Sequence, residues 1–252
     1  QSGFTAVPSD LFGLLVANAF WCDVCGPGGQ GLMYFGSGLP ATVYFTSSGR
    51  TYTYFSGALD IAAHELTHGV TDNTSRLIYR GESGALNEAF SDMMGKATEF
   101  YFRTQRGSAP GQADYIIGKD ISRAVRSGAL NGDRSMADPL AYGDPDHYSR
   151  LYRGSVDNGG VHSNSGIANN AFYLAIEGGT NRTSGLAVQG VGSTNREQIE
   201  KVFFRAFTLL LPPNATFATA RAATTQAARD LYGIGSAPER AITQAWTAVG
   251  GQ

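Results

Sequence analysis

The sequence predicts an α+β fold, in which a short β-rich N-terminal part is followed by a mainly helical domain. Residues 1–57 are rich in glycine, serine, threonine and aromatic side chains, a composition typical of short strands and hairpins. From residue 58 onward, apolar residues recur at helical spacing. We place a boundary near residue 75, so that residues 1–75 form a truncated β-rich part ending in a helix and residues 76–252 form the helical domain.

Local signals predict the individual elements in order. Short strands are expected at residues 31–35, 42–45 and 51–55. The first helix is expected at residues 58–71, because Leu59, Ala62 and Leu66 share one face. Thr194 and Glu197 match a capping box for a later helix. The remaining helices are predicted at residues 83–102, 167–177, 194–211, 216–232 and 238–249, with a loop-rich stretch at residues 110–160.

Composition excludes several classes of protein. The formal net charge is −2, so no basic patch for a nucleic acid is expected. No apolar stretch approaches the roughly 18 residues of a membrane span. The chain starts with Gln1 and has no lysine or arginine before Arg50, so it shows no signal peptide and its start is predicted to be processed.

Two cysteines, Cys22 and Cys25, form a single C-x-x-C pair. A structural zinc site would need two further ligands, so one pair is a weak metal signal. No βαβ pattern surrounds the pair, which disfavours a redox motif. A small-loop disulfide is the favoured interpretation, with free structural thiols and a metal site as the alternatives.

The sharpest motif is H-E-x-x-H at residues 64–68, inside a predicted helix. His64 and His68 lie one turn apart, so two imidazoles can reach one zinc ion. Glu65 then lies beside the metal, where a carboxylate can act as a base on water. The alternative is a pair of ordinary histidines on a partly buried helix face.

A third zinc ligand must come from another segment. Glu88 lies 20 residues after His68 on the next predicted helix, and an antiparallel helix pair would bring it back to the histidines. Asp92 lies four residues further on the same face, where it could accept a hydrogen bond from a zinc-bound histidine. The alternative for both carboxylates is a solvated helix face.

At this point the chain resembles the thermolysin-like zinc metalloendopeptidases of the gluzincin class. The matching blocks follow the family's order along most of the first 166 residues. They are residues 18–21 (Asn-Ala-Phe-Trp), 60–68, 84–92, 134–139, 142–148 and 157–166. The helices that follow residue 166 also fit the family's layout.

The resemblance implies a catalytic mechanism. One catalytic zinc ion would be held by His64, His68 and Glu88, with a water at the fourth position. Glu65 would be the general base on that water. His162 and Tyr79 would stabilise the oxyanion, and Asp157 would orient His162.

The resemblance also implies a substrate cleft. Arg134 would bind the substrate carbonyl after the scissile bond, and Asn18 and Ala19 would hold the substrate backbone. The S1′ pocket would be lined by Tyr52, Phe55, Ile61, Ile117 and Asp133. This lining favours apolar residues at P1′, although Asp133 stands where the family usually has an apolar residue.

Family members often bind calcium near the catalytic helices. Asp60, Glu99 and Asp114 stand at matching carboxylate positions, and three carboxylates suit one hard cation. Ile116 and Lys119 stand at places that are acidic in members with two calcium ions. We therefore expect one calcium at most, and the alternative is a salt-bridged cluster that uses Lys96 and Lys119.

Together these features predict a secreted, extracellular zinc metalloendopeptidase that cleaves protein or peptide substrates. The alternatives are a catalytically inactive zinc-binding module of the same fold and a zinc aminopeptidase. Family members carry a substantial β-rich domain before the Asn-Ala-Phe-Trp block, whereas only 17 residues precede it here. The expected partners are therefore substrates and either the chain's own propeptide or a separated N-terminal fragment, with no nucleic acid and no membrane.

Overall fold

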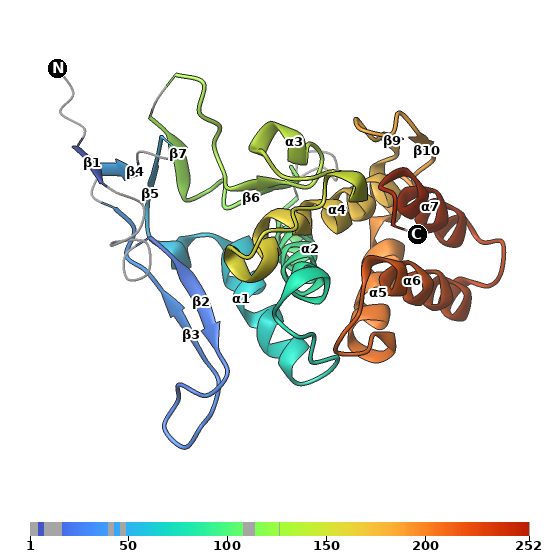
Figure 1. Cartoon of the computed structure of the whole chain (residues 1–252), viewed down its shortest axis with the longest axis horizontal. Coiled ribbons are helices and arrows are strands. Elements are labelled where there is room, and N and C mark those ends of the chain that lie inside the picture. The colour runs from blue at the N-terminus through green and yellow to red at the C-terminus, as the bar shows by residue number, and fades with distance from the viewer. Residues whose placement is uncertain are drawn as a thin grey trace.

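The computed structural model describes residues 5–7, 17–39, 43–45, 49–107, 114–125 and 127–251. Most strands lie at one side of the molecule and most helices at the other, while the two short strands at residues 179–180 and 187–188 lie beside the C-terminal helices (Figure 1). This arrangement confirms the predicted α+β class, with a short β-containing part ahead of a helical domain.

The largest sheet has four short strands in the order β1 (Thr5–Val7), β4 (Val43–Phe45), β5 (Arg50–Tyr52) and β7 (Ser122–Ala124). β1 pairs with β4 in parallel, and the other neighbours are antiparallel. Three two-stranded ribbons complete the strands. They are β2 (Ala19–Cys22) with β3 (Leu32–Phe35), β6 (Ile116–Ile117) with β8 (Arg134–Ser135), and β9 (Gly179–Thr180) with β10 (Ala187–Val188).

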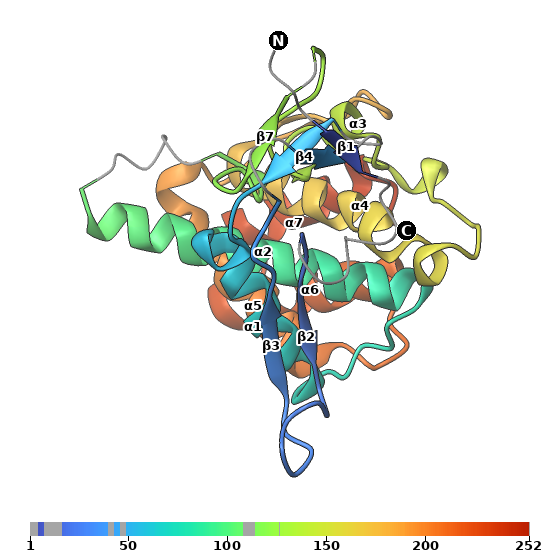
Figure 2. The ribbon, with the colours of Figure 1, turned by 90° about the vertical axis from the view of Figure 1, so that its left-hand side faces the viewer.

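The longest helices among the described residues, α2 (Gly81–Gln105) and α4 (Asp157–Glu177), pack against each other at the centre of the helical domain. The other helices and the short turns lie around or beside them (Figure 2). The other α-helices are α1 (Leu59–Asp72), α3 (Pro139–Tyr142), α5 (Arg196–Arg205), α6 (Phe217–Tyr232) and α7 (Ala237–Ala248). Single turns lie at Phe55–Gly57, Tyr148–Arg150, Ser193–Asn195 and Ala206–Leu210.

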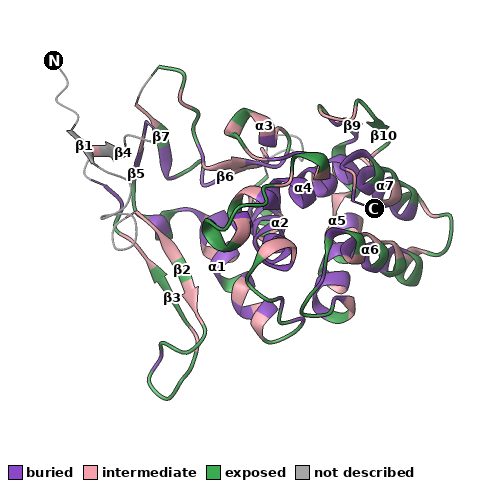
Figure 3. Ribbon diagram, in the orientation of Figure 1, coloured by how far each residue is buried: buried purple, intermediate pink, exposed green. Residues whose placement is uncertain are grey.

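The core lies between α2, α4 and the C-terminal helices, whose inner faces are buried (Figure 3). Aromatic rings fill it: Phe90 stacks on Phe207 at 4.9 Å, and Phe172 meets Phe203 edge-on at 5.2 Å. Such pairs stabilise a core beyond the area that they bury. This packed core supports α1 and α2, the two helices that carry the predicted site.

A glycine allows α1 and α2 to approach closely. A Cβ on Gly95 would lie 2.6 Å from the carbonyl oxygen of Asp60, which is too close for any other residue. At the other side of α1, Trp21 Nε1 donates to Asp72 Oδ2 at 2.6 Å and ties the β2–β3 hairpin to the helix. The hairpin and both helices therefore meet around the zinc motif.

Several predicted elements differ from the structure. The predicted helix at residues 167–177 starts earlier in the structure. α4 spans Asp157–Glu177, but Asn158, Gly159 and Gly160 kink its first turn through positive φ angles, so the regular helix runs from Val161. The capping box at Thr194 is wrong, because α5 begins after Asn195 and no side chain caps it. The strand expected at residues 51–55 ends at Tyr52, and residue 42 of another lies outside the described residues.

The cysteine pair forms a disulfide, with the Cα atoms of Cys22 and Cys25 5.6 Å apart, as the favoured interpretation predicted. His147 begins the turn at Tyr148–Arg150, and its Nδ1 accepts from Ser149 N at 3.1 Å. No helix in the described parts of the chain has the length and apolar character needed to span a membrane.

Candidate active site

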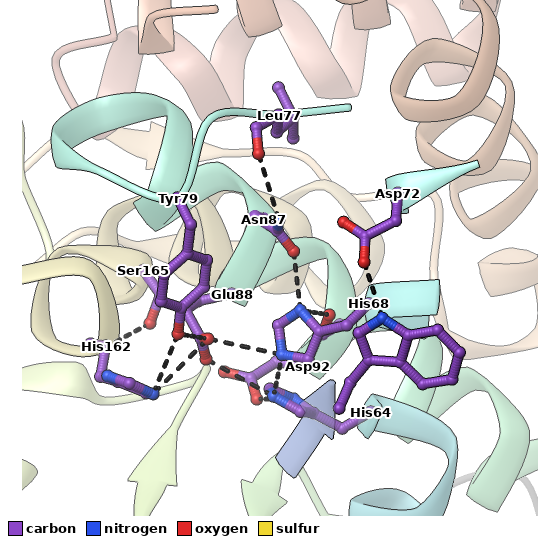
Figure 4. Close-up of polar contacts among 12 residues, drawn as sticks. His64, His68, Asp72, Leu77, Tyr79, Asn87, Glu88, Asp92, His162 and Ser165 are labelled. Atoms are coloured by element: carbon purple, nitrogen blue, oxygen red, sulfur yellow. Dashed lines mark hydrogen bonds and ion pairs between the residues drawn. The ribbon is translucent and has the colours of Figure 1, made fainter. Parts of the chain in front are cut away.

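Three side chains converge at the junction of α1 and α2 (Figure 4). Nε2 of His64 lies 3.1 Å from Nε2 of His68. The carboxylate of Glu88 reaches both rings: Oε2 lies 3.4 Å from His64 Nε2 and Oε1 lies 3.4 Å from His68 Nε2. All three come from long, well-packed helices, so the triangle is held by the scaffold and not by loops.

The size of this triangle fits zinc. Ligand atoms at about 2.0–2.1 Å from a tetrahedral ion are about 3.3–3.4 Å from one another. Glu88 is only 1% exposed, and its Oε2 has no hydrogen-bond partner. A buried carboxylate oxygen without a donor is costly, so this atom points to a cation as its partner. In the described part of the chain, no other group of three His, Cys, Asp or Glu side chains converges in this way.

Each histidine ring also has a polar neighbour at Nδ1, the nitrogen that faces away from the triangle. Asp92 Oδ1 lies 2.9 Å from His64 Nδ1, which is where the sequence analysis placed this carboxylate. His68 Nδ1 lies 2.7 Å from Asn87 Oδ1 and 3.2 Å from the hydroxyl of Ser91. Nε2 of both rings faces the triangle, so it is the nitrogen through which each histidine would bind zinc.

Asp92 is the centre of a buried polar network. Arg134 donates to it through two N–H groups, at 2.9 Å to Oδ2 and 2.7 Å to Oδ1, and Asn169 donates at 2.8 Å. Despite full burial, which alone would raise it, the pKa of Asp92 is lowered by Arg134 and His64. The carboxylate therefore stays ionised behind the zinc-site ring.

Glu65 is 6% exposed and follows His64 directly on α1. Burial raises its pKa above the ordinary carboxyl value, and Glu88 adds to the rise while His64 and Arg134 oppose it. A carboxylate with a raised pKa is a better base near neutral pH than an exposed one. It lines the same cleft as the zinc-site residues.

Tyr79 and His162 lie across the site from α1. The Tyr79 hydroxyl donates to Glu88 Oε1 and lies 3.4 Å from His162 Nε2. Burial, and then the charge of Glu88, raise the pKa of Tyr79 well above its ordinary value, so its hydroxyl keeps its proton. The Tyr79 hydroxyl and the His162 ring therefore lie on the same side of the ligand triangle.

Asp157 holds the His162 ring from the far side. Its Oδ1 lies 2.7 Å from His162 Nδ1, and its Oδ2 accepts from His162 N at 3.0 Å. Burial lowers the pKa of His162, but Glu88 and Asp157 outweigh it and the net shift is upward. Glu88 and Asp157 thus favour the protonated form of the ring.

A cleft of about 500 Å³ runs past these groups. Its walls bring together residues from β2, α1, α2 and α4. They are Asn18, Ala19, Phe20, Trp21, Asp23, His64, Glu65, His68, Asp72, Leu77, Tyr79, Asn87, Glu88 and His162. Asn18 and Ala19, which the sequence analysis expected to hold substrate backbone, thus line this cleft.

Two comparisons with family models bear on this geometry. Residues 10–72 match the model of the thermolysin metallopeptidase catalytic domain. Residues 75–250 match the model of the thermolysin metallopeptidase alpha-helical domain. The chain belongs to the thermolysin family of metallopeptidases.

Relatives of this thermolysin-family chain include the thermostable neutral protease NprT of Geobacillus stearothermophilus, 48% identical over 82% of this chain and 35% of the relative. The thermolysin of Alicyclobacillus acidocaldarius is 47% identical over 82% of this chain and 36% of the relative. Among solved structures, the precursor of protealysin from Serratia proteamaculans matches with a TM-score of 0.69 and 30% identity, covering 93% of this chain and 65% of that one. The chain spans about a third of the length of the two curated relatives.

The five residues predicted for the S1′ pocket lie together in this thermolysin-family chain. Tyr52 stacks on Phe55 at 5.5 Å, and its hydroxyl donates to Asp133 Oδ1 at 2.7 Å. Asp133 N donates to the carbonyl of Ile117 at 2.8 Å. Ile61 and Asp133 both face Gly118. The Asp133 carboxylate is paired with Arg50 at 3.4 Å, so a neighbouring positive charge balances it.

The ammonium group of Lys96 lies at the centre of the predicted calcium ligands. Lys96 is 1% exposed, and its Nζ contacts the Glu99 carboxylate. It donates to the Ile116 carbonyl at 3.1 Å, and lies 3.8 Å from both Asp60 Oδ2 and Asp114 Oδ1. These are the oxygens that a calcium ion would need. The residues therefore do not fit calcium, and the salt-bridged alternative describes the cluster.

Charges within this cluster already balance. Arg103 pairs with Glu99 at 2.5 Å, and Lys119 pairs with Asp114. The predicted calcium ligands carry three negative charges, and Lys96, Arg103 and Lys119 supply three positive charges beside them. A divalent cation would add two charges beside a buried ammonium, which low dielectric makes unfavourable.

We expect calcium to leave the melting temperature of the zinc-loaded chain unchanged. In Lys96→Ala the carboxylates lose their buried counter-ion, so the free energy of unfolding should fall by about 3–5 kcal/mol, and added calcium should then restore part of it. Thermal melts at saturating zinc, with and without millimolar calcium, measure both effects. Lys201→Ala is the control, because it removes an exposed lysine that pairs with Glu197. Its free energy of unfolding should equal that of the wild type, and added calcium should not change it. A calcium-dependent rise in the wild-type melting temperature would contradict the assignment.

Proposed function

We propose that this chain is a zinc metalloendopeptidase that hydrolyses internal peptide bonds of proteins or peptides. The observation that carries the proposal is the ligand triangle of His64, His68 and Glu88, which has zinc dimensions and opens into a cleft beside Glu65. One zinc ion is the proposed cofactor, and no calcium site is proposed. The family match and the neutral protease and thermolysin relatives support the same activity.

Zinc, when bound, supplies a Lewis acid that brings the pKa of water down to about 7 and polarises a carbonyl. Glu65 is the general base that takes the proton from the attacking water, since it is a buried carboxylate directly beside a ligand. His162 and Tyr79 donate hydrogen bonds to the oxyanion that develops on the scissile carbonyl. Asp157 keeps the His162 ring oriented for that task.

Substrate binding follows from the cleft walls. Asn18 and Ala19 at the start of β2 are proposed to pair with an extended substrate backbone. Arg134 is proposed to contact the substrate carbonyl after the scissile bond with the N–H groups that Asp92 does not occupy. Phe55, Ile61 and Ile117 give S1′ an apolar body, and the Arg50 pairing neutralises Asp133, so we propose a preference for apolar P1′ residues.

We further propose that the protein is secreted and acts outside the cell. The Cys22–Cys25 disulfide supports this, because disulfides persist in oxidising compartments. The proposed partners, besides substrates, are its propeptide or a separated N-terminal fragment. The exposed apolar side chains of the β2–β3 hairpin, among them Met33 and Tyr34, offer such a segment a surface.

Digestion of casein and of a mixed peptide library, followed by mass spectrometry of the products, tests the function. We expect internal cleavage that requires zinc, with apolar residues enriched at P1′. Stepwise loss of terminal residues would indicate an aminopeptidase. No cleavage with zinc bound would indicate an inactive zinc-binding module, and a P1′ preference for lysine or arginine would refute the apolar S1′ pocket alone.

A further inference from the structure

One end of the cleft carries two carboxylates that the proposed chemistry does not use. Asp72 lies at the end of α1, four residues after His68, and Asp23 lies just beyond β2. Both line the cleft together with the Trp21 ring and the zinc-site histidines. No lysine or arginine is among the described residues that line it. This end of the cleft therefore carries two carboxylates that no cleft-lining lysine or arginine balances.

Local structure holds the Asp72 carboxylate and the backbone around Asp23 in place. Trp21 Nε1 donates to Asp72 Oδ2 at 2.6 Å and leaves the second oxygen available. Asp23 lies inside the short loop closed by the Cys22–Cys25 disulfide, and Gly26 N donates to Gln30 O at 2.7 Å just beyond it. Burial first, and also the charge of Asp23, raise the pKa of Asp72. The Asp23 and Asp72 side chains are thus close enough for their charges to interact.

We propose that Asp23 and Asp72 select substrates with a lysine or arginine at the P2 position, two residues before the scissile bond. This inference rests on the proposed peptidase function and on S1′ lying at the Ile61 end of α1. Ile61 precedes His64 and Asp72 follows His68, so they lie at opposite ends of the zinc-site helix. The Asp72 end therefore receives residues on the amino-terminal side of the bond.

The helix geometry gives the position. A rise of about 1.5 Å per residue places Asp72 about 6 Å beyond His68 along α1. An extended substrate advances by about 3.3 Å per residue, so the second residue before the bond reaches this point. The Trp21 ring supplies an apolar wall for the methylene chain of a lysine or arginine, whose charged end then meets the carboxylates.

Paired peptides that differ only at P2 test the proposal. For the zinc-loaded wild type, we expect kcat/KM for a lysine peptide to exceed that for its norleucine twin by about fivefold, as suits a partly exposed ion pair. Asp23→Asn should reduce this ratio to about twofold, and raising the ionic strength should reduce it in the wild type. Asp120→Asn removes an exposed aspartate that does not line the cleft, and is the matched control.

The outcomes separate this inference from the function on which it rests. Cleavage of neither peptide would refute the peptidase function. Equal cleavage of both peptides by the wild type would refute the selection by Asp23 and Asp72 while the peptidase function stands. A ratio that Asp23→Asn leaves unchanged would refute the role of Asp23 in it. A preference for a glutamate peptide would also overturn it.

Discussion

Glu65→Gln is expected to lower kcat/KM for peptide hydrolysis by about three to four orders of magnitude, while one zinc ion per chain remains bound. Glutamine has the size of glutamate but cannot accept the proton of the attacking water. Because Glu65 is not one of the three converging ligand atoms, its loss leaves the metal site intact. Steady-state kinetics and zinc analysis on the same preparation measure the two effects.

Glu197→Gln is the control for this variant. It removes a carboxylate that is exposed on α5 and should leave both activity and zinc content unchanged. Activity within tenfold of the wild type in Glu65→Gln would refute the assigned base. Loss of zinc would show instead that Glu65 holds the metal.

Asp92→Asn is expected to lower both the stability of the fold and the affinity for zinc. It leaves the Arg134 guanidinium buried without its counter-ion, which should lower the free energy of unfolding by about 3–5 kcal/mol. It also removes the negative charge next to Nδ1 of His64, so the affinity of the site for zinc should fall by about 10–100-fold. Chemical denaturation and a competitive zinc titration measure these changes.

The pH dependence of this effect has a defined sign. The pKa of Asp92 is lower in the folded chain than its ordinary value of 3.8, so its stabilisation is present above about pH 4 and is lost as the pH falls further. The difference between wild type and Asp92→Asn should therefore shrink in acid. The control Asp230→Asn, which breaks an exposed pair with Arg205, should cost far less. An equal loss in both variants would contradict the role of Asp92.

The sequence predicted the long helices well, because their apolar periodicity and their breakers are local signals. α1 and α6 each agree with the predicted bounds to within one residue, and the Thr216 side chain caps α6. The start of α4 could not be predicted, because Asn158, Gly159 and Gly160 bend the backbone there and break the periodic pattern. The two-residue strands β6 and β8 depend on pairing between distant segments, which no local signal records.

The site was predictable where a motif fixes spacing on a helix. His64 and His68 follow from H-E-x-x-H, and Glu88 from the helix that returns beside it. The partners of His68, Asn87 and Ser91, lie within a block that carried the resemblance, but they are neutral and gave no signal of their own.

Two further features needed the tertiary structure. Lys96 at the centre of the carboxylates depends on how α1, α2 and β6 meet. Asp23 lies in a loop whose path toward the cleft depends on a disulfide and on the docking of Trp21.

The central claim is that two imidazoles and one carboxylate hold a single zinc ion and leave one place for water. Glu65→Gln suits the test, because an inactive variant cannot digest itself. Its zinc-edge X-ray absorption spectrum should show two imidazoles and two oxygen atoms at about 2.0–2.2 Å. A sulfur neighbour near about 2.3 Å, or a third imidazole in place of the Glu88 carboxylate, would contradict the claim.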